Sequence, residues 1–248
     1  MKKLIYMLMS GYMLLSMVGC DQKIDFPYEG KDRIQFRHYT TDSRGNRTYS
    51  DSLVFSFGLQ PDEILIDTAK IVMEYLGKGA DVERTYRVVV VPDSTTAVAG
   101  THYEPIDELQ KFRPGKLTDT LRIVVYRENL STSFRNPVTV RLDLRLEPTD
   151  DFDLGLMGGI RKKVLMNNYM SEPDWWNDNT GLGYYHPEKW KILISFNEQY
   201  ANQHECPFDI NNEGRTYAQG LEAYLNAVPT FDEETGERVM MDELVPQE

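Results

Sequence analysis

The chain has 248 residues, with 27 Lys or Arg against 39 Asp or Glu, and its formal net charge is −12. This acidity argues against nucleic acid and anionic lipid headgroups as partners, because both are bound through cationic side chains. Its two cysteines and four scattered histidines lack the spacing of a transition-metal site. The length is sufficient for one large domain or two smaller ones.

Residues 1–19 have the pattern of a secretory signal peptide. Two lysines precede an uncharged apolar run, residues 4–18, which is short for a membrane-spanning helix of about 20 residues. The run closes on Gly19 and Cys20, an arrangement typical of bacterial lipoproteins, in which the cysteine is acylated before the leader is cut off. We therefore expect palmitate-type chains on Cys20 that anchor the protein in the bacterial cell envelope, at the surface or periplasmic face of the outer membrane. The alternative is an ordinary signal peptide, or a signal anchor, with an incidental cysteine.

Residues 20–31 form a polar tether, and strand patterns dominate residues 32–156. Apolar and polar residues alternate over residues 69–75 and again over residues 138–146. Such alternation indicates strands with one face on a core and the other in water, as in antiparallel sheets. Turn sequences such as PDST and RPGK separate several runs of this kind. The pattern predicts a mainly β protein with an immunoglobulin-like antiparallel β-sandwich over residues 32–156.

From residue 157 the alternation fades, and residues 157–248 are expected to form a smaller, mixed region that contains helices. Pro187 stands where a helix can begin, because its missing N–H is not needed in the first turn. Residues 217–228 carry apolar side chains at helical spacing, which predicts an amphipathic helix. The sequence leaves open whether this region folds independently. It also leaves open whether Cys206 is buried or an exposed thiol.

Two adjacent tryptophans, Trp175 and Trp176, are the first candidates for ligand binding. Flat indole faces can stack on the C–H faces of sugar rings, and the carboxylate of Asp178 could orient sugar hydroxyls. These three residues are therefore the candidate glycan-binding set. The alternative is burial of the indoles, because large aromatic side chains dominate cores and adjacent side chains seldom point the same way.

The sequence TDDFDLG gathers three acidic side chains, Asp150, Asp151 and Asp153. Their oxygens suit calcium, although the spacing is not that of an EF-hand loop. The alternative is a solvated turn at the end of a strand, and no other cofactor is expected. The sequence contains no P-loop, dinucleotide-binding or nucleophile-elbow motif, so we expect a protein without catalytic activity.

Several motifs occur together in an order that resembles a known family. They are the lipoprotein-type cysteine, DSLVFSFGLQP, RTYRVVVV, TTAVAGTHYEPI, VTVRLDLRLEPTDDFDLG, PDWWND and LGYYHPEKWKILI. As a set they resemble the Bacteroidetes lipoproteins grouped as domain of unknown function 4843, over residues 51–196. The AVAGTHY stretch is also similar to Calx-beta domains, which are immunoglobulin-like sandwiches.

The resemblance implies a surface or periplasmic lipoprotein, often found beside outer-membrane nutrient-uptake systems of the starch-utilisation type. It supplies no catalytic residue. Calx-beta domains can bind calcium through clustered acids at one end, and here only Asp150, Asp151 and Asp153 are obvious counterparts.

We therefore expect a lipid-anchored, non-catalytic accessory protein of the cell envelope that binds a glycan or a partner protein of such an uptake system. One alternative is a structural or adhesive subunit of a surface fibre, although the charged tether with Pro27 is poorly suited to act as a donated strand. Another alternative is a glycoside hydrolase, since carboxylates are plentiful in the chain.

Overall fold

The computed structural model describes residues 30–205 and 213–246, except for the side chain of Asp178. The expected signal peptide, Cys20 and most of the tether lie outside the described residues, and so does Cys206. Within the described ranges, no helix is both long enough and apolar enough to cross a membrane.

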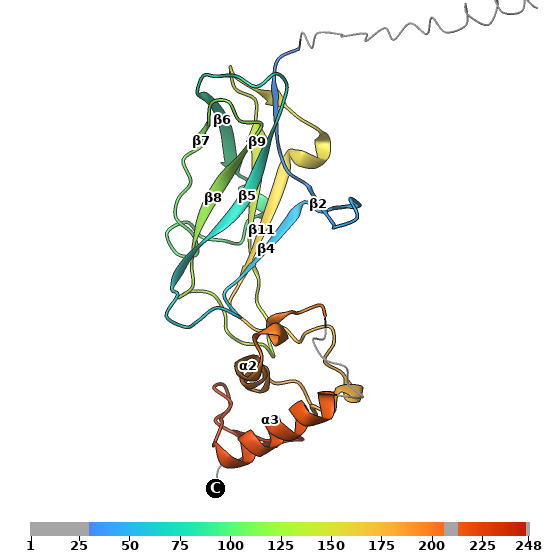
Figure 1. Cartoon of the computed structure of the whole chain (residues 1–248). Coiled ribbons are helices and arrows are strands. Elements are labelled where there is room, and N and C mark those ends of the chain that lie inside the picture. The colour runs from blue at the N-terminus through green and yellow to red at the C-terminus, as the bar shows by residue number, and fades with distance from the viewer. Residues whose placement is uncertain (1–29, 206–212, 247–248) are drawn as a thin grey trace, which may run out of the picture. The chain divides into compact units, whose positions relative to one another are not determined.

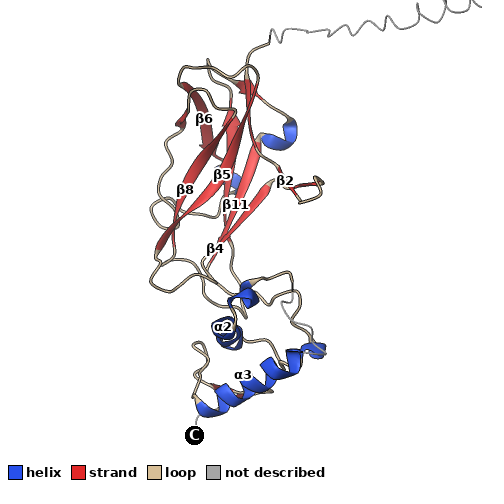
Figure 2. Ribbon diagram, in the orientation of Figure 1, coloured by secondary structure: helices blue, strands red, loops and turns tan. Residues whose placement is uncertain are grey.

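Two β-sheets pack as the layers of a sandwich (Figures 1 and 2). One sheet has the strand order β10-β1-β5-β8, and the other has the order β4-β11-β9-β6-β7. The first consists of β1 (Arg33–Phe36), β5 (Ile66–Leu76), β8 (Thr118–Tyr126) and β10 (Asp153–Leu154). The second consists of β4 (Ser52–Ser56), β6 (Arg84–Val90), β7 (Leu109–Phe112), β9 (Val140–Glu147) and β11 (Arg161–Asn167).

Most neighbouring strands are antiparallel, as the alternation predicts, but two pairs are parallel. β1 runs parallel to β10, and β4 runs parallel to β11. The parallel pairs arise where the chain changes sheets. After β1 the chain leaves the first sheet and returns as β4, at the edge of the second sheet.

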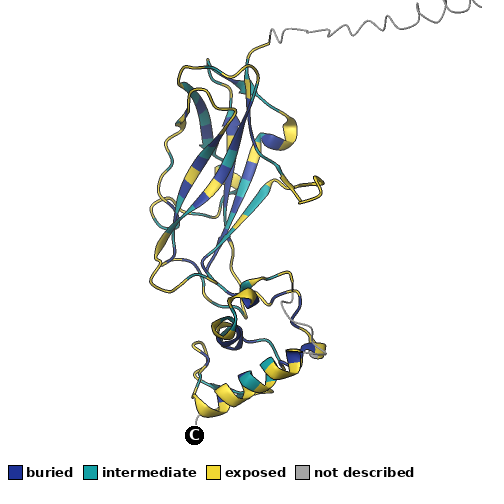
Figure 3. Cartoon of the chain, viewed as in Figure 1, coloured by how far each residue is buried: buried dark blue, intermediate teal, exposed yellow. Residues whose placement is uncertain are grey.

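The sandwich core contains alternate residues from both sheets. Ile71 and Met73 of β5 and Leu142 and Leu144 of β9 are each at most 2 % exposed and belong to one apolar cluster. Figure 3 shows the resulting alternation of buried and exposed positions along the strands. Burying one such side chain contributes roughly 1.5–3 kcal/mol, so these strands hold the two sheets together. The predicted mainly β fold is confirmed.

The sandwich extends beyond residue 156, which corrects the expected boundary. β11 pairs with β9 on one side and with β4 on the other, so it lies inside the second sheet. The alternation in β11 is disguised because Lys162 occupies an inward position beside Val164 and Met166, and all three are buried. Because one of the buried positions carries a charged side chain, the alternation of apolar and polar residues that marks a strand is incomplete in the sequence.

A short hairpin links β1 to β4 and projects from the sandwich (Figure 1). Its strands are β2 (Tyr39–Thr41) and β3 (Arg47–Tyr49). Gly45 supplies a φ of 86° in the turn, a conformation that favours glycine. The Asp42 carboxylate accepts a hydrogen bond from the backbone N–H of Asn46 at 2.8 Å, which closes the turn.

The C-terminal region has its own apolar core around two helices, α2 (Pro187–Phe196) and α3 (Arg215–Ala227). Trp190 and Leu221 are at most 1 % exposed in this core. Both predicted helices are confirmed, and α2 begins at Pro187, as expected. The remaining elements are the short strands β12 (Arg238–Val239) and β13 (Leu244–Val245) and the 3-10 turns η1 (Pro92–Ser94), η2 (Met157–Gly159), η3 (Asp178–Thr180) and η4 (Glu198–Ala201).

Candidate functional site

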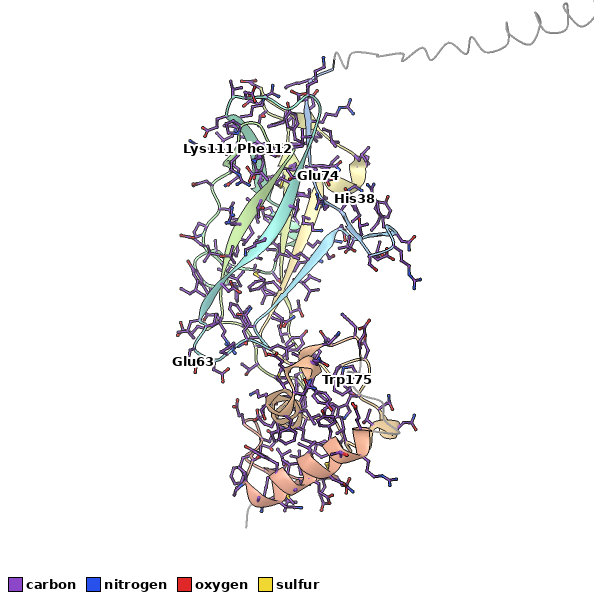
Figure 4. All side chains as sticks on the ribbon, in the orientation of Figure 1. His38, Glu63, Glu74, Lys111, Phe112 and Trp175 are labelled. Atoms are coloured by element: carbon purple, nitrogen blue, oxygen red, sulfur yellow. The ribbon has the colours of Figure 1, made fainter. Side chains whose placement is uncertain are left out.

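The tryptophans expected to stack on sugar belong to the core of the C-terminal region. Trp175 is 7 % exposed and Trp176 is 5 % exposed, and their rings stack on each other with centroids 5.8 Å apart. The Trp175 indole N–H donates to the carbonyl of Asn202 at 2.8 Å, and that of Trp176 donates to the carbonyl of Gly183 at 3.0 Å. Figure 4 shows Trp175 within this region. Neither ring has a face exposed for stacking on a sugar. The two indoles are therefore buried packing residues, the alternative given for them above.

The third residue of that set, Asp178, has its backbone in η3, and its side chain lies outside the described residues. The structure therefore brings the two tryptophans together but provides no sugar-binding surface from them.

The three aspartates proposed for calcium do not converge on one point. Asp151 accepts hydrogen bonds from the Thr85 N–H at 2.7 Å and from the Thr85 hydroxyl at 2.9 Å. Asp153 lies 3.4 Å from the Lys31 ammonium, and Asp150 is exposed. Among the described residues, no group of three or more His, Cys, Asp or Glu side chains could hold a metal ion. Asp150 and Asp151 lie in a bend before β10, where Asp151 organises the backbone, and Asp153 lies in β10, so the three side chains do not gather as a calcium site requires.

The best candidate site is a groove of about 500 Å³ at the base of the hairpin, which we term the hairpin groove. It lies where β1 ends and the chain changes sheets. Its lining comes from the hairpin and its flanks, from β4, from the middle of β5 and from β11. The lining residues are Arg37, Tyr39, Thr40, Thr41, Ser50, Ser52, Leu53, Lys70, Ile71, Val72 and Lys162.

Aromatic rings stand beside this groove. Tyr39 and Tyr49 are paired across the hairpin, with ring centroids 6.1 Å apart. The His38 ring lies 5.5 Å from that of Tyr49, and Figure 4 shows His38 next to the hairpin. Tyr49 is 63 % exposed. The guanidinium of Arg47 lies 4.2 Å from the centre of the Tyr39 ring, which lines the groove. Tyr49 is outside the lining but next to Tyr39, so it is the ring available to a ligand that extends out of the groove.

A buried carboxylate holds the start of the hairpin in place. Glu74 accepts hydrogen bonds from the Gln35 amide at 2.8 Å, the Arg37 guanidinium at 2.8 Å and the Tyr39 hydroxyl at 2.9 Å. Burial would raise the pKa of Glu74, but these three donors outweigh burial and lower it. Although the alternation over residues 69–75 places Glu74 on the face of β5 opposite the apolar core, it is only 8 % exposed. Its charge fixes Arg37 and Tyr39 at the groove.

Lys162 lies under the hairpin and is 7 % exposed. Its ammonium donates to the carbonyls of Arg37 and Ser50 at 3.3 and 3.2 Å, so it links the two ends of the hairpin. Burial lowers the pKa of Lys162, and the more distant charge of Asp51 offsets only part of that effect. The groove thus has a desolvated cation in its lining.

A second cavity, of about 330 Å³, lies where the sandwich loops meet α2. Charged side chains line it, and each of its two cations is paired with a carboxylate of the same lining. Arg127 binds Asp62 at 2.8 Å, and Lys191 binds Glu188 at 2.7 Å. With both cations paired, and with Asp232 bound to Arg135 and His186, we regard this cavity as part of the packing between the two regions.

Sequence reasoning missed the hairpin groove, although it left traces in the sequence. The segment RHYTTDSRGNRTYS has a Gly-containing turn between two tyrosines and is rich in arginine within an acidic chain. That pattern identifies an exposed aromatic hairpin. It does not show that residues 70–72 and Lys162 approach the same place.

The fold and groove define a β-sandwich protein with a helical C-terminal region and a polar, aromatic-flanked groove. The chain belongs to the family that shares the domain of unknown function DUF4843, whose model matches residues 28–199. No curated protein is significantly similar to the chain.

Several solved structures are similar to the sandwich. The apo-form Calx CBD1 domain is 15 % identical with a TM-score of 0.37, and the match covers 56 % of this chain and 98 % of that domain. A Bacteroides ovatus protein described as a candidate carbohydrate-binding protein is 12 % identical with a TM-score of 0.36, and the match covers 56 % of this chain and 37 % of that protein. A two-domain protein of unknown function from Bacteroides fragilis is 9 % identical with a TM-score of 0.33, covering 66 % and 58 % of the two chains. The match thus spans well under half of the Bacteroides ovatus protein.

Proposed function

We propose that this protein is a lipid-anchored, non-catalytic component of the cell envelope that binds a glycan in the hairpin groove. The observation that carries the proposal is the exposed ring of Tyr49 next to Tyr39, which lines the cavity together with hydroxyl and cationic side chains. Sugars present C–H faces that pack on aromatic rings and hydroxyls that hydrogen-bond to such groups. Concave sites that combine a few polar groups with aromatic surface are the usual form of small-ligand sites.

The lining chemistry supports binding rather than hydrolysis. Glycosidases use a pair of carboxyl groups about 5–10 Å apart around the scissile bond. None of the described residues that line the groove is Asp or Glu. The neighbouring carboxylate, Glu74, already accepts three hydrogen bonds.

The envelope location rests on the sequence at Cys20 and on the family resemblance. A lipid-anchored glycan binder beside an outer-membrane uptake system would concentrate polysaccharide near the importer. We propose such an uptake system as the partner and expect no nucleic-acid partner, because the chain is acidic.

A glycan array tests the function directly. We expect the full chain, purified in detergent, to bind one polysaccharide class, with no dependence on calcium. Tyr49→Ala should weaken that binding about tenfold, the loss expected for one ring contact. Phe231→Ala is the matched control, since Phe231 is an exposed aromatic in the C-terminal region. A blank array with folded protein, or equal losses in both variants, would overturn the proposal.

A further inference from the structure

Within the part of the chain that the structure describes, two of the three cationic side chains that line the hairpin groove do not stabilise the fold through an ion pair. Arg37, Lys70 and Lys162 all belong to its lining, within a chain whose net charge is −12. Arg37 is compensated by Glu74, at 2.8 Å. The other two cations have no carboxylate in ion-pair contact among the described residues.

Lys162 is the clearer case. An ammonium so deeply buried is destabilising unless a negative charge compensates for it. Two carbonyl oxygens at 3.2 and 3.3 Å satisfy hydrogen bonds but carry no net charge. The nearby carboxylate of Asp51 is bound to Lys163, at 2.7 Å. A carboxylate entering the groove would supply the missing charge.

Lys70 shows the same imbalance on the sheet surface. It is exposed, and its cross-strand partner on β8 is Arg122. Like charges placed directly opposite each other in a sheet are destabilising. The pairing of β5 with β8 therefore does not explain why Lys70 and Arg122 occupy these positions. An anionic ligand would convert this repulsion into attraction.

We propose that the hairpin groove selects glycans that carry carboxylates, of the uronate type. Lys162 at the base of the groove and Lys70 at its side attract the carboxylate, while Tyr49 contacts a ring face. The inference rests on the proposed glycan-binding function and adds the chemical class of the sugar.

Matched polysaccharide pairs separate the inference from the function on which it rests. The full chain is titrated with polygalacturonate, alginate and glucuronoxylan, and with the same polymers after their carboxyls have been reduced to alcohols. We expect at least one uronate polymer to bind about tenfold more tightly than its reduced counterpart at low salt. This advantage should shrink as salt is added, because exposed charges are screened.

Charge variants then locate the selectivity. Lys70→Glu should weaken binding of the uronate polymer about fivefold or more and weaken binding of the reduced polymer much less. Lys116→Glu is the matched control, since it makes the same charge change at an exposed lysine outside the groove lining. Lys162→Met tests the buried cation, and its retained binding of the reduced polymer would show that the groove is still formed.

Each outcome has one meaning. Equal binding of the uronate and reduced polymers overturns the charge selectivity and leaves the glycan function standing. A uronate preference that survives in both Lys70→Glu and Lys162→Met overturns the assignment to this groove. Binding of neither polymer, together with a blank array, overturns the proposed function itself.

Discussion

Arg135, in a loop of the sandwich, forms an ion pair with Asp232 of the C-terminal region, 97 residues further along the chain. The same carboxylate receives the Nε2–H of His186 at 2.7 Å. The tautomer follows from the other ring nitrogen, because His186 Nδ1 accepts the Glu188 N–H at the start of α2. One buried carboxylate therefore connects the sandwich, the start of α2 and the loop before β12.

Replacing this carboxylate should loosen the connection. We expect Asp232→Asn to lower the free energy of unfolding by about 2–3 kcal/mol, because Arg135 loses the closer of its two carboxylate partners and a charge-assisted bond to His186 is lost. Urea denaturation monitored by tryptophan fluorescence measures the change. Glu234→Gln is the control, since Glu234 is 3.5 Å from Arg135 and partly exposed, and it should cost less than about 1 kcal/mol. Equal effects of the two substitutions would contradict the role assigned to Asp232.

The same cluster predicts acid sensitivity. Burial lowers the pKa of His186 below 6.5, so the unfolded chain takes up a proton first and stability falls as the pH drops below 6.5. Burial would raise the pKa of Asp232, but its hydrogen-bond donors lower it below 3.8, so a second loss follows as the pH falls below about 4.

Urea midpoints at pH 7, 5.5, 4 and 3 check this sensitivity. His186→Gln should reduce the loss between pH 7 and 5.5. Burial also lowers the pKa of His102, so a remaining share of that loss is expected in the variant. A midpoint that is constant from pH 7 to pH 4 would refute the prediction.

Trp176→Ala should destabilise the C-terminal region rather than remove a ligand contact. Truncating a buried aromatic side chain costs about 3–5 kcal/mol, and the Gly183 carbonyl would also lose its donor. Thermal unfolding of the variant beside Phe231→Ala measures the difference. If the variant kept its stability but lost glycan binding, Trp176 would be a ligand-contacting residue and the prediction would be wrong.

Glu74→Gln should release the hairpin without unfolding the sandwich. The neutral side chain is a poorer acceptor for Arg37 and Tyr39, so we expect a loss of about 1–3 kcal/mol. Hydrogen exchange should quicken at the backbone amides of residues 39–49. Glu63→Gln, at an exposed glutamate labelled in Figure 4, should leave exchange unchanged.

The proposed lipid anchor is tested by replacing Cys20, the residue expected to carry the acyl chains. Cys20→Ala should abolish incorporation of labelled palmitate and move the protein from the membrane to the soluble envelope fraction. Full retention in the membrane fraction would instead favour an uncleaved signal anchor.

Much of the fold can be predicted from local sequence patterns. In a sandwich, buried and exposed side chains alternate along each strand, so the hydrophobic pattern repeats every two residues. Alternation over residues 69–75 locates the buried face of β5, and Pro187 marks the start of α2. Glu74 and Lys162 escape such reasoning, because each is a charged residue buried by partners that are distant in sequence. The hairpin groove escapes for the same reason, since its lining comes from four separate segments.

The tryptophan pair illustrates a different limit. The sequence correctly raises burial as the alternative, but the expectation that neighbouring side chains diverge fails. Residues 174 and 175 lie in a turn, so the two indoles stack at 29° instead of pointing to opposite faces as they would on a strand.

The position of β11 also determines when the sandwich can be completed. β4 and β9 both precede β11 in the chain. In the sheet, however, β11 lies between them and pairs with each. Ser56 and Asn167, which share a hydrogen bond across the parallel pair, are 111 residues apart. Contacts so distant in sequence form slowly, because a long loop must close first. Because the chain is synthesised from its amino terminus, the facing edges of β4 and β9 therefore stay unpaired until β11 has been made, and during that interval they are open to aggregation.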